Sequence, residues 1–159
     1  MALETDQNLL LEEDFDDTIK DQYLCFTVDS DEYAIAVARV KEIVPILPIT
    51  TVPETPDYVK GIINLRGDIL PVIGVRTRFG KPEIPYDENT CIIVITCPDC
   101  DYMIGLIVDQ VISTYTITED AISAPPNARL AHSNMYVKHI GRASDGLKLL
   151  LDLDKLIAQ

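Results

Sequence analysis

The stretch TTVPETPDYVKGIINLRGDILPVIGV, residues 50–75, holds two apolar runs separated by a tight turn. The runs are VKGIINL and DILPVIGV, and Arg66-Gly67 stands between them. Gly67 permits the backbone conformation that such a turn requires. Because proline has no backbone N–H to donate, the proline of the second run favours an edge or bulged strand. The stretch predicts a β-hairpin.

The chain upstream has the pattern of a second hairpin. QYLCFTV (22–28) places alternate side chains on opposite faces, which is typical of a strand. Asp29-Ser30-Asp31 is turn chemistry, and EYAIAV (32–37) supplies the returning strand.

Between the two hairpins, VARVKEIVPIL (37–47) has apolar residues at helical spacing. Val37, Val40, Ile43 and Val44 would share one helical face, so the spacing predicts a helix of about two turns. Pro45 and Pro48 would end it.

The second half of the chain repeats the pattern of short apolar runs separated by turns. After a polar, Pro- and Gly-punctuated segment (76–90), which predicts a boundary between two halves, several short apolar runs are separated by turns. A helix is expected only at the C-terminal end. Short strands with little helix predict an all-β barrel or sandwich. The runs are CIIVIT (91–96), YMIGLIVD (102–109), VISTYTI (111–117), MYVKHIGRA (135–143) and LKLLLDL (147–153).

Composition points to a cytoplasmic protein. The chain has 159 residues and is 47% hydrophobic, enough for one domain or for two small barrels that share a core. It lacks an apolar run of roughly 18 residues, so no membrane insertion is expected. Residues 1–20 are acidic without a basic segment, which argues against a secretory signal and predicts a flexible acidic arm.

Charge disfavours nucleic acid as a partner, because the net charge of −13 repels phosphate. The segment 38–81 nevertheless has more basic than acidic residues. It is either an ordinary solvated segment or a docking surface for an acidic protein. Its basic residues are Arg39, Lys41, Lys60, Arg66, Arg76, Arg78 and Lys81, and its acidic residues are Glu42, Glu54, Asp57 and Asp68.

No motif for catalysis stands out. The two histidines, His132 and His139, have no recognisable nucleophile beside them, and there is no Walker loop, G-x-S-x-G or H-E-x-x-H. We therefore expect neither an enzyme nor a cofactor.

Cysteines offer one alternative chemistry. Cys97-Pro98-Asp99-Cys100 is a C-x-x-C at a predicted hairpin tip, but zinc needs four ligands and no second such pair occurs. An incidental turn is the simplest interpretation. Metal binding with groups from elsewhere, or redox activity of Cys97 and Cys100, stays open. Cys25 and Cys91 lie in apolar runs and are interpreted as small buried hydrophobes.

Several short motifs occur in order along residues 22–157. The most specific is KGIINLRG (60–67). In this order they resemble the CheW family, whose members carry K-G-x-x-N-L-R-G, V-x-E-I and G-x-x-V-D-x-V. The other matching segments are YLCF (23–26), VKEI (40–43), PETP (53–56), GLIVDQV (105–111) and LLLDLDKL (149–156).

The resemblance implies two five-stranded SH3-like β-barrels on a common hydrophobic core, with short helices between strands and at the C-terminus. Their expected bounds are 21–85 and 86–159, within one CheW-like domain over 21–159. It implies a non-catalytic adaptor that couples methyl-accepting chemoreceptors to the regulatory domain of the histidine kinase CheA. Such an adaptor is a monomer when isolated and is recruited to membrane receptor arrays.

The resemblance also implies a receptor-binding groove between the barrels, because a receptor tip is helical and a helix docks in an apolar groove. Val40, Glu42, Arg66, Val111 and Thr114 would line it, although each could instead serve the barrel core or an ion pair. It leaves the kinase-binding residues unassigned.

One position departs from the family, which has D-L-R where this chain has Gly74-Val75-Arg76. The lost carboxylate puts a local ion pair in doubt. A CheW-like scaffold of another chemosensory or pilus system is the alternative within the same class, and a metal- or redox-sensing β-barrel is the alternative from another class.

Overall fold

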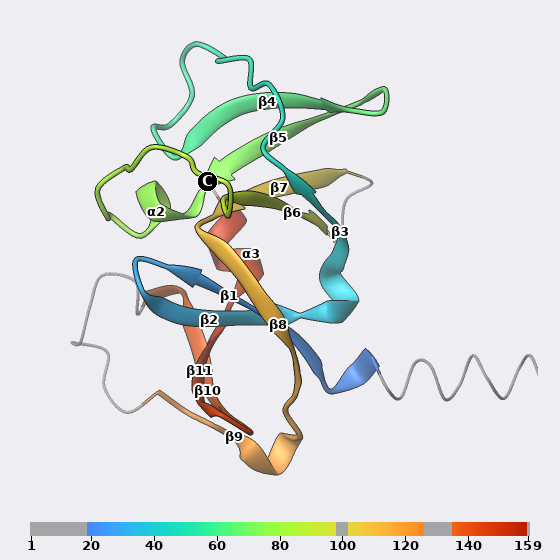
Figure 1. Ribbon diagram of the computed structural model, residues 1–159, viewed down its shortest axis with the longest axis vertical. Coiled ribbons are helices and arrows are strands. Elements are labelled where there is room, and N and C mark those ends of the chain that lie inside the picture. The colour runs from blue at the N-terminus through green and yellow to red at the C-terminus, as the bar shows by residue number, and fades with distance from the viewer. Residues whose placement is uncertain (1–18, 98–101, 126–134, 159) are drawn as a thin grey trace, which may run out of the picture.

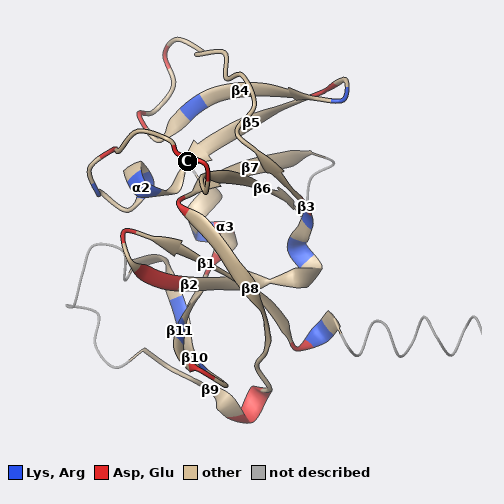
Figure 2. Cartoon of the chain, viewed as in Figure 1, with Lys and Arg blue, Asp and Glu red and all other residues tan. Residues whose placement is uncertain are grey.

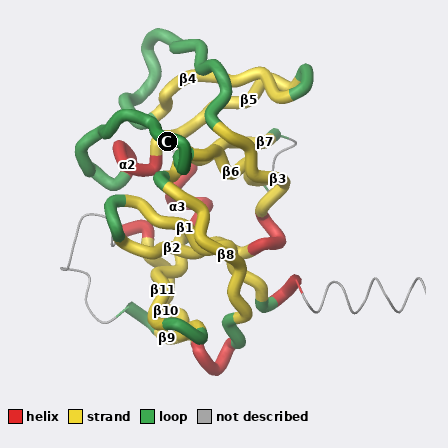
Figure 3. The backbone as a smooth tube through the Cα atoms, viewed as in Figure 1, coloured by secondary structure: helices red, strands yellow, loops and turns green. Residues whose placement is uncertain are grey.

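The computed structural model describes residues 19–97, 102–125 and 135–158. In these residues the backbone forms two β-sheets and a few short helices (Figures 1 and 3). The predicted all-β fold is confirmed. Most of the arm predicted over residues 1–20 lies outside the described residues. No helix in the described part of the chain is long and apolar enough to cross a membrane.

A six-stranded sheet forms the lower half of the molecule in Figure 1, in the order β8-β1-β2-β11-β10-β9. The predicted hairpin of β1 and β2 is confirmed, and Asp29 and Ser30 take positive φ at its turn. The resemblance implied five strands, and the two-residue β9 accompanies β10 as a sixth. The strands are β1 (Gln22–Val28), β2 (Asp31–Ala36), β8 (Gln110–Thr116), β9 (Ile122–Ser123), β10 (Val137–Ala143) and β11 (Gly146–Leu151).

A five-stranded sheet forms the upper half, in the order β3-β6-β7-β5-β4. The hairpin predicted over residues 59–75 is confirmed as β4 and β5, with Arg66 and Gly67 in positive φ at its turn. The strands are β3 (Val40–Pro45), β4 (Val59–Leu65), β5 (Asp68–Gly74), β6 (Cys91–Thr96) and β7 (Met103–Val108).

The helix predicted between the hairpins is wrong. Only a 3-10 turn, η1 (Val37–Arg39), precedes strand β3. β3 pairs with β6, so that Val44 is buried while Ile43 next to it is 43% exposed. The β-branched side chains fit this alternating pattern better than a helical face, because pairing with β6 supplies burial that a local spacing cannot reveal.

The two sheets do not divide at residue 85 as the sequence predicted. Strands β6 and β7 follow that residue but pair with β3 and β5, and β11 pairs with β2. The parallel pairs β5–β7 and β2–β11 join distant segments, so each sheet takes strands from both halves of the chain. The polar segment after β5 begins with the short helix α2 (Val75–Arg78) and crosses the surface as a loop.

One hydrophobic core serves both sheets. Phe26 and Tyr33 of the six-stranded sheet belong to the same buried cluster as Ile93 and Leu106 of the five-stranded sheet. The terminal helix α3 (Leu153–Ile157), which confirms the helix predicted there, adds two buried leucines to this cluster. Shared burial of this kind holds the sheets as one unit.

Candidate functional site

The predicted receptor-binding residues fall on the edges of the two sheets. Val40 and Glu42 lie on β3, an edge strand of the five-stranded sheet, and Val111 and Thr114 lie on β8, an edge strand of the six-stranded sheet. The chain passes from β7 to β8 through Asp109 alone, so β8 starts beside one sheet and runs across the other (Figure 1).

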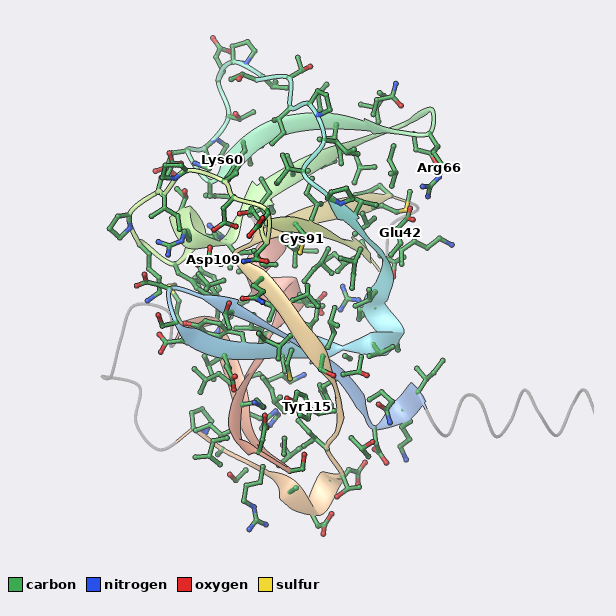
Figure 4. All side chains as sticks on the ribbon, in the orientation of Figure 1. Glu42, Lys60, Arg66, Cys91, Asp109 and Tyr115 are labelled. Atoms are coloured by element: carbon green, nitrogen blue, oxygen red, sulfur yellow. The ribbon has the colours of Figure 1, made fainter. Side chains whose placement is uncertain are left out.

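The structure brings Glu42 and Arg66 together. Arg66 lies at the β4–β5 turn, and its guanidinium donates a hydrogen bond to the Glu42 carboxylate, as Figure 4 shows. The Asn64 side chain braces this turn by accepting a hydrogen bond from the Gly67 N–H at 2.8 Å. Because the Arg66 side chain is 70% exposed, the pair adds little to stability and is accessible to a partner.

Val40 and Val111 lie at the margin of the shared core. Both are partly buried and pack against it. Val111 lies opposite Phe26 in the pairing of β8 with β1, and its backbone N–H donates a hydrogen bond to the Cys91 thiol at the start of β6. The start of β8 therefore contacts the start of β6. Thr114 lies further along β8, on its exposed part and opposite Leu24.

Two exposed isoleucines flank the predicted residues and were missed by the sequence reasoning. Ile43 on β3 is 43% exposed and Ile112 on β8 is 39% exposed. On a strand, residues 41, 43 and 45 face away from residues 40, 42 and 44. The mistaken helix over this segment hid that separation, which would have identified Ile43 as an outward residue.

The excess positive charge of segment 38–81 is largely neutralised within the molecule. Five of its seven basic residues form ion pairs with carboxylates, and Figure 2 shows Lys and Arg on several separate elements. A free basic docking surface is therefore not what the structure shows. The pairs are Arg39–Asp154, Lys60–Glu83, Arg66–Glu42, Arg76 with Asp29 and Asp109, and Lys81 with Asp29 and Asp31.

Gly74 explains how this chain does without the carboxylate of the family's D-L-R. A Cβ at Gly74 would lie 2.7 Å from Cε of Lys60, so the Lys60 side chain occupies that space. Lys60 reaches across Gly74 to an ion pair with Glu83 on the following loop. Arg76 keeps carboxylate partners of its own in Asp109 and Asp29. Both basic residues near Gly74 thus have carboxylate partners in this chain.

The cysteines give little support to metal or redox chemistry. Cys97 is half-buried and follows β6, while Cys100 lies outside the described residues. Burial raises the pKa of the Cys25 thiol to about 11 and also raises the pKa of Cys91, which disfavours the reactive thiolate. Within the described ranges, no three His, Cys, Asp or Glu side chains gather to hold a metal.

Two cavities lie away from the predicted residues. One of about 220 Å³ is bounded by Lys60, Arg76, Tyr86 and Asp109. The other, of about 620 Å³, lies between the β4–β5 hairpin and α3 and is lined mostly by apolar residues such as Ile62 and Ile157.

Comparison with known proteins identifies the fold and its role. The family model of the CheW-like domain matches residues 22–159. The chain belongs to the CheW family. It is 32% identical over 142 residues to the chemotaxis protein CheW of Klebsiella aerogenes, which covers 89% of this chain and 84% of the relative. The CheW protein of Helicobacter pylori is 31% identical over 136 residues, covering 86% and 81%.

A solved structure supports the same assignment. The crystal structure of the scaffolding protein TtCheW from Thermoanaerobacter tengcongensis superposes with a TM-score of 0.79 at 31% identity, covering 87% of this chain and 93% of that one. The two sheets are thus the SH3-like barrels of a CheW fold. As a member of this family the chain is a chemotaxis adaptor, in a family of scaffolds that generally lack catalytic activity.

Proposed function

We propose that this CheW-family adaptor binds the cytoplasmic tip of a chemoreceptor with one surface and the regulatory domain of CheA with another. It does so as a cytoplasmic monomer recruited to receptor arrays, and it catalyses no reaction itself. The observation that carries the proposal is the buried cluster that both sheets share, because an adaptor must hold two surfaces in a fixed relation.

The proposed receptor face consists of Val40, Glu42, Arg66, Val111 and Thr114, together with Ile112. A helical receptor tip needs an apolar strip with a polar rim. The exposed Ile112 supplies apolar surface, and the Glu42–Arg66 pair supplies a polar rim. Edge strands suit this role, since one side of each has no neighbouring strand.

Substitutions on this face should weaken receptor binding without unfolding the protein. We expect Arg66→Ala and Ile112→Asp to bind receptor-containing membranes about tenfold more weakly in co-sedimentation, a loss of about 1.4 kcal/mol. Arg142→Ala is the matched control, because Arg142 is exposed on β10 and lies outside the proposed face. If both variants fold and bind receptor as tightly as the wild type, the proposed receptor face is wrong.

We propose that the kinase face lies at the tip of the β10–β11 hairpin. Leu147 beside that turn is 62% exposed. The regulatory domain of CheA resembles this same fold, so barrels would meet end to end through such apolar side chains. Leu147→Asp should lower CheA activation while leaving co-sedimentation with receptor unchanged. Normal activation with this variant would contradict the assignment.

A further inference from the structure

Asp109 occupies the point at which the chain crosses from one sheet to the other. It separates the last residue of β7 from the first residue of β8. Its backbone N–H donates to the Thr27 carbonyl at 3.1 Å, and its carboxylate accepts a hydrogen bond from the Asp29 N–H at 2.8 Å. Asp109 is therefore bound to the β1–β2 hairpin although it follows directly from the five-stranded sheet (Figure 4).

Arg76 completes this junction. It lies on α2, directly after β5, and its side chain is only 14% exposed. Nε donates to Asp109 at 2.9 Å and 3.2 Å, and Nη2 donates to Asp109 and to Asp29, each at 3.0 Å. Nη1 donates to the Pro82 carbonyl at 2.7 Å. The planar guanidinium thus contacts both carboxylate oxygens of Asp109, a geometry that fixes direction as well as distance.

These contacts connect rigid parts of different sheets. β5 is an inner strand of the five-stranded sheet, whereas Asp29 belongs to the turn of a hairpin in the six-stranded sheet. The direction in which β8 leaves Asp109 determines where Val111 and Ile112 lie relative to β3. A change at the junction would therefore be transmitted to the receptor face.

We propose that Arg76 and Asp109 form a latch that sets the orientation of the two sheets and thereby positions the receptor face. Arg76 is a positioning residue in this role, since it acts through Asp109 and β8. The inference rests on the proposed receptor face for its effect on binding, but the orientation of the sheets can be measured without any partner.

The structure provides a control ionic cluster that does not join the sheets. Lys148 is fully buried and pairs with Glu32 and Asp145, and all three residues lie within the six-stranded sheet or its turns. Lys148→Met removes a buried charge and its ion pairs but leaves the junction intact. If Arg76 only stabilised the fold, its substitution and Lys148→Met would affect the orientation of the sheets in the same way.

Residual dipolar couplings of backbone amides in the two sheets test the latch on the full chain. We expect one alignment tensor to fit both sheets in the wild type and in Lys148→Met. In Arg76→Gln and Asp109→Asn the tensors of the two sheets should differ, and receptor binding should fall about three- to tenfold. Arg76→Lys keeps the positive charge but loses the forked guanidinium. Its effect on the tensors and on binding should therefore lie between those of the wild type and Arg76→Gln.

The outcomes separate the latch from the receptor face. A single shared tensor in folded Asp109→Asn or Arg76→Gln protein would overturn the latch, whatever Ile112→Asp does. If Arg76→Gln or Asp109→Asn shows divergent tensors but binds receptor like the wild type, the positioning role is overturned. If Ile112→Asp also binds like the wild type in the same assay, the receptor face is the part of the proposal that fails. If Arg76→Gln does not fold, Arg76→Lys and Asp109→Asn serve as the test of the latch.

Discussion

Gly61 is the residue at which a side chain is least compatible with the fold. Its φ is +144°, and a Cβ there would lie 2.2 Å from the Thr50 carbonyl oxygen. That oxygen accepts from the Ile62 N–H at 2.9 Å in the bridge between Thr50 and Ile62. We expect Gly61→Ala to lower the free energy of unfolding by on the order of 3 kcal/mol, measured by urea denaturation.

Gly67 is the matched control for Gly61. Its φ is +94°, but a Cβ would meet no atom within 4 Å. Gly67→Ala should therefore cost only conformational strain, about 1 kcal/mol. Equal losses for the two variants would show that crowding by Thr50 has no part in the effect.

Asp145 makes the stability of the six-stranded sheet sensitive to acid. The Tyr115 hydroxyl donates to its carboxylate at 2.8 Å and Lys148 lies 3.0 Å away, and both contacts lower the pKa of Asp145. A carboxyl with a lowered folded pKa stabilises the fold above its unfolded pKa of about 3.9 and loses that contribution as pH falls through the folded value. Tyr115→Phe should raise the pKa of Asp145, as measured by carboxyl NMR titration, and an unchanged pKa would contradict this.

At the residue scale, the resemblance selected residues without indicating which side chains touch. Resemblance to the CheW family selected Glu42 and Arg66, and the structure joins them in an ion pair. The pair of Arg76 with Asp109 was not foreseen, because it exists only where β7 and β8 meet the β1–β2 turn. Contacts of that kind depend on the folded crossing and have no local sequence signal.

At the scale of elements, helix α3 depends on one side chain from elsewhere in the chain. Arg78 donates hydrogen bonds to the carbonyls of Lys155, Leu156 and Ala158, at the end of a helix too short to be stable alone. Its guanidinium also lies 4.0 Å from the centre of the Tyr58 ring. We expect Arg78→Ala to increase amide exchange throughout α3 by about tenfold or more.

Arg78→Lys gives the control for that prediction. A lysine retains the charge but lacks the fork that serves several carbonyls, so it should restore only part of the protection. Arg142→Ala, toward the far end of β10 from α3, should leave exchange in α3 unchanged. Wild-type exchange of α3 in Arg78→Ala would mean that burial of its two leucines is sufficient.

The elements that the sequence predicted correctly are those whose strands and turn are adjacent in the sequence. The β1–β2 and β4–β5 hairpins each combine two runs with turn residues between them. The segment 37–44 has apolar spacing compatible with either structure, and pairing with β6 about 50 residues later decides for a strand. The parallel pairs β2–β11 and β5–β7, which interleave the two halves, likewise depend on long-range contact.

At the scale of the whole molecule, the shared core excludes independent behaviour of the two sheets. Phe26, Tyr33, Phe79 and Tyr136 form a continuous row of aromatic contacts with ring centres 6.1, 5.0 and 5.6 Å apart in succession. The row runs from β1 and β2 through Phe79, the residue after α2, to Tyr136 just before β10, and its neighbours in the core include strands of the other sheet. Loss of a central ring should therefore weaken both sheets together.

Unfolding should accordingly be a single transition for the entire molecule. Cys25 is fully buried in the six-stranded sheet, so its alkylation, followed by mass spectrometry, reports opening of that sheet. Amide exchange in β6 and β7 reports opening of the five-stranded sheet.

We expect the two probes to share one urea midpoint, because neither sheet retains a complete core when the other opens. Phe26→Ala should lower stability by about 3–5 kcal/mol and shift both midpoints equally. Midpoints that separate, in the wild type or in this variant, would show that each barrel folds alone and that the rigid coupling needed by an adaptor must come from its partners.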